Sequence, residues 1–254
     1  MDTLAKYREV IGVIGGMGSY ATLDFFHRLL NAFPAEKEWE RPRIIVDNRC
    51  TMPSRVRAIL YNERKAEIRE SLAESTRNLL ASGATVLILA CNTSHFFLED
   101  IYKAVPNSKG KFINIIAALG RKLEPYRGES FLLLASEGTL DSGLYQRYLQ
   151  PYGLSIKIPP KNVYPVLREM IEDVKQDKID EHTTKKFIGL VQELNEKRII
   201  IGCTEFPAIL ARCKEDKNLT GYEMFDPLQA VIEDLQSICR IKDIEKGRKQ
   251  NGNK

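Results

Sequence analysis

Leu-Ile-Leu-Ala-Cys-Asn-Thr (87–93) and Ile-Ile-Ile-Gly-Cys-Thr-Glu (199–205) are the two stretches that decide the fold of this chain. Each is a short apolar run that ends at a cysteine, Cys91 or Cys203, and each has a threonine within the next two residues. A little under half of the 254-residue chain separates the two cysteines. A thiol at the same point of two similar strands indicates a duplicated domain, with one cysteine from each copy.

Apolar strands and amphipathic helices alternate on both sides of these stretches. In the first half, strands are predicted at 10–14, 44–47 and 86–90, with helices at 21–31 and 63–82. In the second half, strands are predicted at 131–135, 155–158 and 198–201, with helices around Tyr145, at 163–177 and at 183–194. A last helix, at about 227–243, is expected to pack on the first half. This alternation is typical of an α/β fold with parallel sheets covered on both faces.

Four predicted strand ends carry polar or flexible residues. The glycine-rich turn 15–18, Cys91, the pair Gly138-Thr139 and Cys203 each follow a strand. Ligands of parallel sheets bind beyond the carboxyl ends of the strands. These four segments are therefore expected to converge on one cleft.

The composition favours a soluble protein with a sizeable core. Hydrophobic residues make up 43% of the chain, charged residues 28%, and the net charge is +4. No apolar run approaches the roughly 20 residues of a membrane span, and the N-terminus lacks a signal-peptide core, so we expect a cytoplasmic protein without a membrane partner. There is no basic stripe with interleaved aromatic residues, which argues against nucleic-acid binding. The tail 244–254 is expected to be disordered.

Five cysteines and three scattered histidines do not form a disulfide framework or a zinc site. An isolated cysteine is most often a small core residue, and we interpret Cys50, Cys213 and Cys239 in this way. Cys91 and Cys203 differ because asparagine, threonine and glutamate follow them. Polar donors and helix N-termini beside a thiol can stabilise a thiolate.

The glycine-rich turn lacks the GxGxxG spacing of a dinucleotide site. Its glycines more plausibly let backbone N–H groups approach a carboxylate. Arg55, expected in a loop after the second strand, and Lys175, late in a helix, are each most simply surface charges. If both face the cleft, they suit a dicarboxylate substrate, because arginine binds a carboxylate through two hydrogen bonds. The sequence gives His95 no chemical role.

Together these segments resemble the aspartate/glutamate racemase family, the cofactor-independent two-cysteine amino-acid racemases. The similarity covers nearly the whole chain and is strongest for the aspartate-specific members. It is carried by five segments in order: Val13 to Gly18 followed by Ala21-Thr22; Ala90 to His95; Ala135 to Tyr145; Gly202 to Glu205; and Asp226-Pro227.

The resemblance implies two α/β subdomains related by pseudo-two-fold symmetry, residues 1–115 plus 225–254 and residues 116–224, with the active site between them. It implies PLP-independent racemisation of an acidic amino acid, most simply L-aspartate to D-aspartate, by a homodimer without a cofactor. Cys91 and Cys203 would be the two bases. Substrate contacts would come from Met17, Gly18, Arg55, Asn92, Thr93, Thr139, Lys175 and Thr204.

Two residues depart from the family pattern: Ser19 replaces a proline, and Ser54 replaces the aspartate of a Pro-Asp-Arg segment. The second departure concerns whether the residue at position 54 orients Arg55, and therefore whether the substrate is specifically aspartate. Glutamate or broad-specificity racemisation, isomerisation or decarboxylation of another small acid, and a dicarboxylate-binding protein without turnover are the alternatives.

Overall fold

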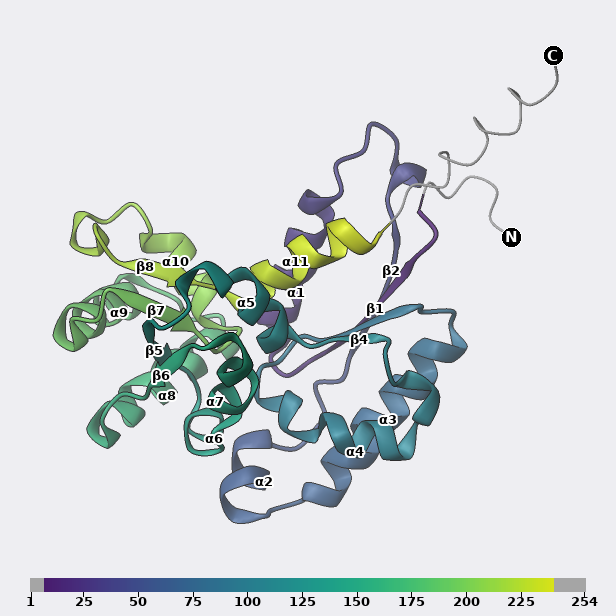
Figure 1. The fold of residues 1–254 in the computed structure, drawn as a ribbon, viewed down its shortest axis with the longest axis horizontal. Coiled ribbons are helices and arrows are strands. Elements are labelled where there is room, and N and C mark those ends of the chain that lie inside the picture. Colours follow the sequence, from purple (N-terminus) through teal and green to yellow (C-terminus); the bar gives the residue numbers. More distant parts are fainter. Residues whose placement is uncertain (1–6, 240–254) are drawn as a thin grey trace.

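The structure is a computed structural model, and it describes residues 7–239. The predicted disordered tail 244–254 and the end of the last predicted helix lie outside the described residues. Within them, two four-stranded parallel sheets lie side by side, each flanked by helices (Figure 1). The predicted α/β fold with two similar sheets is confirmed.

The first sheet has the order β2-β1-β3-β4, and every neighbouring pair is parallel. Its strand β1 lies between β2 and β3, and five of its six residues are buried. The strands are β1 (Val10–Gly15), β2 (Arg43–Asn48), β3 (Val86–Leu89) and β4 (Phe112–Ile113).

The second sheet repeats this topology in the order β6-β5-β7-β8, again with parallel pairs throughout. Cys91 follows β3 and Cys203 follows β7, and these two strands occupy the same position in their sheets. The duplication predicted from the cysteine stretches therefore matches the topology. The strands are β5 (Ser130–Leu134), β6 (Ser155–Lys157), β7 (Arg198–Ile201) and β8 (Glu223–Phe225).

The α-helices include several that the sequence did not predict, among them the one that carries Arg55. Arg55 is the first residue of α2, not part of a loop, and Ser54 caps this helix by accepting a hydrogen bond from the Arg57 backbone N–H. The α-helices are α1 (Ser19–Ala32), α2 (Arg55–Tyr61), α3 (Lys65–Ala81), α4 (Leu98–Ala104), α5 (Ile115–Lys122), α6 (Glu137–Asp141), α7 (Leu144–Leu149), α8 (Tyr164–Lys175), α9 (Glu181–Leu194), α10 (Phe206–Cys213) and α11 (Pro227–Ile238). Short 3₁₀ turns cover Glu38–Glu40, Thr93–Phe97, Pro106–Ser108, Glu124–Tyr126, Gln150–Tyr152, Lys161–Val163 and Lys217–Leu219.

The two halves share one hydrophobic core, to which β1, β5 and β7 all contribute. Helix α11 packs against α1 in the first half of the chain, as expected for the last helix, and also against α5. Near its start, Arg28 of α1 forms an ion pair of 2.7 Å with Asp226. Helix α2 also packs against α6, and α1 against α8. The division at 115/116 and 224/225 stays a prediction.

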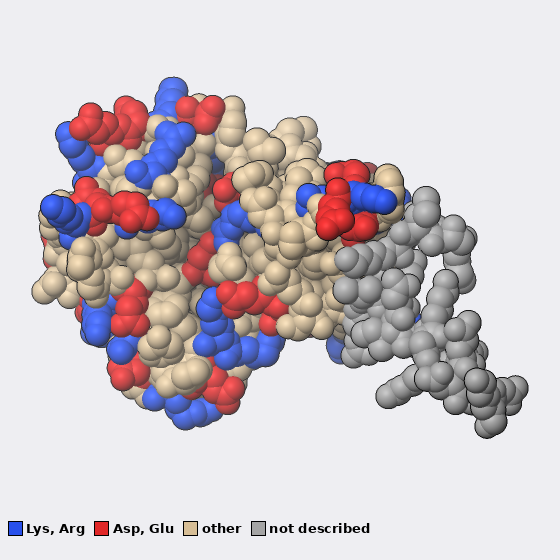
Figure 2. Space-filling model, turned by 90° about the horizontal axis from the view of Figure 1, so that it is seen from above, with Lys and Arg blue, Asp and Glu red and all other residues tan. Residues whose placement is uncertain are grey.

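Acidic and basic side chains are interspersed on the face shown in Figure 2. Ion pairs also join neighbouring elements, such as Lys122 of α5 with Glu233 of α11 at 2.5 Å. Between residues 7 and 239, no helix combines the length and the apolar character needed to cross a bilayer.

Candidate active site

The carboxyl ends of the strands converge as the sequence predicts. A cavity between the two sheets is lined by residues that follow β1, β2, β3, β5 and β7, and we call it the thiol cavity. Its lining residues are Met17, Ser54, Arg55, Val56, Cys91, Asn92, Thr93, Ser136, Ile171, Lys175, Cys203, Thr204 and Glu205.

The loop that carries Cys91 is fixed by a buried histidine. Cys91 is 5% exposed, and its carbonyl oxygen lies 3.0 Å from His95 Nδ1. His95 Nε2 accepts a hydrogen bond from the Ile115 backbone N–H, so Nδ1 must be the protonated nitrogen that donates to Cys91. Burial lowers the pKa of His95 to about 4, which keeps the ring neutral. The loop after β3 is thereby attached to the start of α5.

Asn92 is oriented by a tyrosine from the other half of the chain. The Tyr145 hydroxyl donates a 2.6 Å hydrogen bond to Asn92 Oδ1, and both side chains are buried. Burial, followed by the charges of Asp226 and both cysteines, raises the pKa of Tyr145, so the phenol keeps its proton. Asn92 Nδ2 has no hydrogen-bond partner among the described residues, although it is buried. It is a donor available to a ligand.

Three hydroxyl groups meet where the two halves touch. Thr93 Oγ1 lies 2.9 Å from Thr139 Oγ1 and 3.0 Å from Ser136 Oγ, and Ser136 lies 3.2 Å from Thr139. Thr93 follows β3, whereas Ser136 and Thr139 follow β5. Because each hydroxyl can rotate and act as donor or acceptor, the cluster can turn donors toward an anion in the cavity.

Cys203 is held as a thiol by its neighbour. Its Sγ donates a hydrogen bond of 2.9 Å to Glu205 Oε2, and the Thr204 hydroxyl donates to the same oxygen at 3.2 Å. Burial first, then the Glu205 carboxylate, raises the pKa of Cys203 well above its ordinary value. Cys91 also raises the pKa of Cys203, whereas Lys175 lowers it. Both residues are therefore close enough to the Cys203 sulfur to act on it electrostatically.

The glycine-rich turn brings the first half of the chain to the cavity. Gly16 has φ +78°, and a side chain there would clash with the backbone of Arg49 and Cys50. Only glycine fits this position. The Gly16 N–H donates to the Thr22 hydroxyl at 2.9 Å, so it is not free for a ligand, contrary to the expectation for this turn. Met17 lines the cavity beyond it.

Arg55 enters the cavity tied to the backbone. Its guanidinium donates to the carbonyl oxygens of Met17 at 2.8 Å and Pro53 at 2.9 Å, while Nε is buried without a partner. Ser54 caps the N-terminus of α2 by accepting a hydrogen bond from the Arg57 N–H. It therefore does the capping that the aspartate of a Pro-Asp-Arg segment could do. Arg55 thus has a defined orientation and spare N–H groups.

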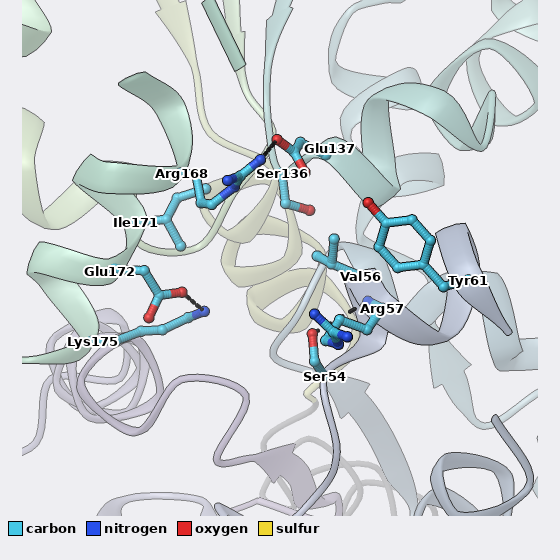
Figure 3. Close-up of a pocket in the computed structure, with 10 residues that line it drawn as sticks. All are labelled: Ser54, Val56, Arg57, Tyr61, Ser136, Glu137, Arg168, Ile171, Glu172 and Lys175. Carbon is cyan, nitrogen blue, oxygen red and sulfur yellow. Dashed lines mark hydrogen bonds and ion pairs between the residues drawn. The ribbon is translucent and has the colours of Figure 1, made fainter. Parts of the chain in front are cut away.

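An outer pocket of about 300 Å³ adjoins the thiol cavity and shares Ser54, Val56, Ser136, Ile171 and Lys175 with it. Figure 3 shows α2 on one side, with Val56, Arg57 and Tyr61, and α8 on the other, with Arg168, Ile171, Glu172 and Lys175. Arg168 pairs with Glu137, and Lys175 with Glu172 at 2.7 Å. Burial opposes the charge on Lys175, but Glu172 and Glu205 together raise its pKa, so the ammonium stays charged.

Most of the residues predicted for the site do line the thiol cavity. Gly18 and Thr139 do not line it, but they adjoin it: Thr139 through Thr93, and Gly18 beside Glu205 and Lys175. Glu205, Tyr145 and Ser136 were not singled out, although all three lie in the segments that carry the family resemblance. In the sequence, Glu205 lies close to Cys203 and Ser136 lies close to Thr139, whereas Tyr145 has no predicted site residue beside it. Cys213 and Cys239 are buried elsewhere, as expected, whereas Cys50 is exposed, so its interpretation as a core residue is wrong.

A family model described as Asp/Glu/Hydantoin racemase matches residues 14–235. The chain belongs to this racemase family. The broad specificity amino-acid racemase RacX of Bacillus subtilis is 23% identical over 79% of this chain and 87% of its own length. A glutamate racemase of Clostridium perfringens is 24% identical over 74% and 71%.

Solved structures share the fold of this chain. The aspartate racemase of Picrophilus torridus superposes with a TM-score of 0.76 at 24% identity, over 92% of this chain and 96% of that one. At this level of identity the similarity shows a common fold. The substrate of this family member has to be argued from its own cavity.

Proposed function

We propose that this protein racemises an acidic amino acid without a pyridoxal cofactor, and that Cys91 and Cys203 are the two bases. The observation that carries the proposal is the placement of the two thiols: they follow equivalent strands of duplicated sheets and line one cavity. We place the two thiols on opposite sides of a substrate bound in this cavity. A carbon bound between the thiols is then accessible from both faces.

The hydrogen bond to Glu205 sets the direction of the first proton transfer. Because its pKa is raised, Cys203 begins as the thiol, and a two-base reaction then requires Cys91 to supply the thiolate. In that state the Cys91 thiolate removes the α-proton from one face, and the Cys203 thiol donates its proton to the other face. Cys91 ends as a thiol and Cys203 as a thiolate. The reverse reaction starts from that second state.

The intermediate is a carbanion beside a carboxylate, so donors must stabilise the negative charge that moves onto the carboxylate oxygens. Asn92 Nδ2 is a buried donor without a partner, and Tyr145 holds the amide in place. The hydroxyls of Thr93, Ser136 and Thr139 supply further donors. We therefore assign the substrate's α-carboxylate to this side of the thiol cavity.

Arg55 and Lys175 favour aspartate as the substrate. Both line the thiol cavity and carry positive charge, which suits a carboxylate in the substrate side chain. Lys175 pairs with Glu172, at the boundary between the cavity and the outer pocket. A substrate carboxylate would replace or share that partner.

The outer pocket supports a second candidate function, racemisation of glutamate or of a broader range of amino acids. Its volume of about 300 Å³ and its shared residues leave room for a side chain longer than that of aspartate. Glutamate or broader racemisation is therefore the alternative substrate range.

The experiment is to incubate the reduced protein with L-aspartate, L-glutamate and a neutral amino acid, without cofactor, and to separate the enantiomers by chiral chromatography. We expect D-aspartate to form fastest, and to form in neither Cys91→Ala nor Cys203→Ala. Cys213→Ala is the matched control, because Cys213 is buried on α10 and does not line the cavity. Full activity of either cavity variant would refute the two-thiol proposal.

A further inference from the structure

Glu205 has an unused carboxylate oxygen inside the site. The residue is 2% exposed, and its Oε2 accepts from both Cys203 and Thr204. Oε1 is buried and has no hydrogen-bond partner among the described residues. Leaving a buried charged oxygen unpaired is costly, so such an atom marks a place where a donor is expected to bind.

The surroundings of Oε1 place it between the two halves of the chain. A Cβ built on Gly18 would lie 3.1 Å from Oε1 and 3.3 Å from Lys175 Cγ. Glu205 follows β7, whereas Gly18 is the N-cap of α1. The N-terminus of α1 favours negative charge nearby, which supports a carboxylate at this point. Because Gly18 has no side chain, the space in front of Oε1 stays open; a side chain at this position would fill it.

The thiol cavity therefore holds unpaired groups of opposite character. Asn92 Nδ2 and Arg55 Nε are buried donors, and Glu205 Oε1 is a buried acceptor. An α-amino acid is a zwitterion that carries an acceptor, its carboxylate, and a donor, its ammonium, on one carbon. Asn92 Nδ2 fits the α-carboxylate and Arg55 Nε a side-chain carboxylate, and among these unpaired atoms lining the cavity only Glu205 Oε1 fits the ammonium.

Lys175 is the competing cation. Its Nζ donates to Glu172 at 2.7 Å, and it influences Glu205 only through charge. Because Lys175 already has a carboxylate partner, Oε1 remains available to a cation that arrives with the ligand.

We propose that Glu205 is a substrate-binding residue whose Oε1 accepts a hydrogen bond from the α-ammonium group of the amino acid, while Oε2 holds the Cys203 thiol. The inference rests on the proposed function and adds a recognition rule to it. Ligands with a free α-amino group are selected over the matching acids that lack one. The same carboxylate positions the amino group next to the thiol that handles the α-proton.

The test compares ligand pairs that differ only in the amino group: aspartate with succinate, and glutamate with glutarate. Dissociation constants are measured by calorimetry for the wild-type protein and for Glu205→Gln. A hydrogen bond between two charged groups predicts that the wild type binds the better amino acid roughly 10- to 100-fold more tightly than its des-amino partner. In Glu205→Gln this preference should fall to within about threefold, with little change for the des-amino acid.

Two further variants separate recognition from folding. Glu169→Gln also removes one carboxylate, but Glu169 pairs with Lys186 outside the cavity, so its ligand preference should match the wild type. Gly18→Ala adds a methyl group in front of Oε1 at a backbone φ of −107° that alanine tolerates, and it should reduce the preference as well. Circular dichroism checks that each variant is folded.

The outcomes distinguish this inference from the proposed function. If the wild type racemises its substrate but binds succinate as tightly as aspartate and glutarate as tightly as glutamate, the role of Glu205 is refuted and the racemase proposal stands, even if Glu205→Gln does not fold. Equal weakening of both members of a pair in Glu205→Gln also refutes it. If the wild type binds none of the four acids and exchanges no α-proton, the proposed function itself fails.

Discussion

Lowering the pH should destabilise the fold around the loop that carries Cys91, because His95 binds a proton less readily in the folded protein than in the unfolded chain. Its Nδ1 donates to the Cys91 carbonyl, and its Nε2 accepts from the Ile115 N–H. A protonated ring would place a second N–H against the Ile115 N–H. Burial also disfavours the charged ring, and it lowers the pKa of His95 from its ordinary value of 6.5 to about 4.

The sign and size of the effect follow from this difference. Below pH 6.5 the unfolded chain binds a proton at His95 that the folded chain does not bind, so stability falls as the pH drops from 6.5 toward 4. Each tenfold difference in proton affinity corresponds to about 1.4 kcal/mol, so the full loss from this group is about 3 kcal/mol, of which about 2 kcal/mol is lost by pH 5. That is a large share of the stability of a typical domain.

The assay is urea unfolding followed by far-ultraviolet circular dichroism, at several values between pH 7.5 and pH 5. Other groups titrate in the same range, so the wild type is compared with His95→Gln, which cannot bind the proton. The variant should be less stable at pH 7.5 and should lose about 2 kcal/mol less than the wild type on going to pH 5. His182→Gln, at an exposed position, should keep the wild-type pH dependence.

Parallel pH curves for the wild type and His95→Gln would refute this reasoning. If His95→Gln does not fold, nuclear magnetic resonance of the wild-type imidazole gives the same answer. A ring that titrates near pH 6.5 in the folded protein contradicts the argument.

Three other substitutions have defined outcomes. Tyr145→Phe removes the 2.6 Å hydrogen bond to Asn92, so urea unfolding should show a free energy of unfolding lower by about 1–2 kcal/mol. Steady-state kinetics should show a kcat/KM reduced about tenfold; unchanged kinetics would mean that the orientation of Asn92 is irrelevant. Lys175→Met should reduce kcat/KM for acidic amino acids by roughly 10- to 100-fold and leave slow turnover of neutral ones unaffected, and an equal loss for both classes would contradict its assignment to the side-chain carboxylate. Gly16→Ala should lower the thermal unfolding midpoint, because alanine disfavours φ +78° and its methyl group meets the Arg49 backbone; an unchanged midpoint would show that the turn can relax.

The strands and the two cysteines could be predicted because their signals are local. The strand over Arg198–Ile201 was placed with its observed bounds, and β1, β3 and β5 to within a residue at either end, since buried parallel strands appear as continuous apolar runs. Strands β4 and β8 were missed because two or three residues carry no readable period. Helix α2 was missed for a related reason: it has seven residues, and its start is marked only by Ser54.

The contacts that build the site join residues far apart in the chain, and no sequence pattern reports them. Tyr145 reaches Asn92 across 53 positions, and Thr93 reaches Thr139 across 46. His95 illustrates the same limit, because its role depends on the Ile115 N–H, which only the folded structure brings near. Glu205 stood beside Cys203 in the sequence, but its unpaired oxygen became visible only in the cavity.

The most direct test of the central claim, that Cys91 and Cys203 act on opposite faces of one carbon, follows deuterium during the first few per cent of the reaction of L-aspartate in deuterium oxide. Chiral separation and mass spectrometry then measure the isotope in each enantiomer. With two bases, the thiol opposite the departing proton supplies solvent deuterium, so the D-aspartate formed should carry one deuterium while the remaining L-aspartate carries none. Early deuterium in both enantiomers, or D-aspartate that retains the original proton, would contradict the account.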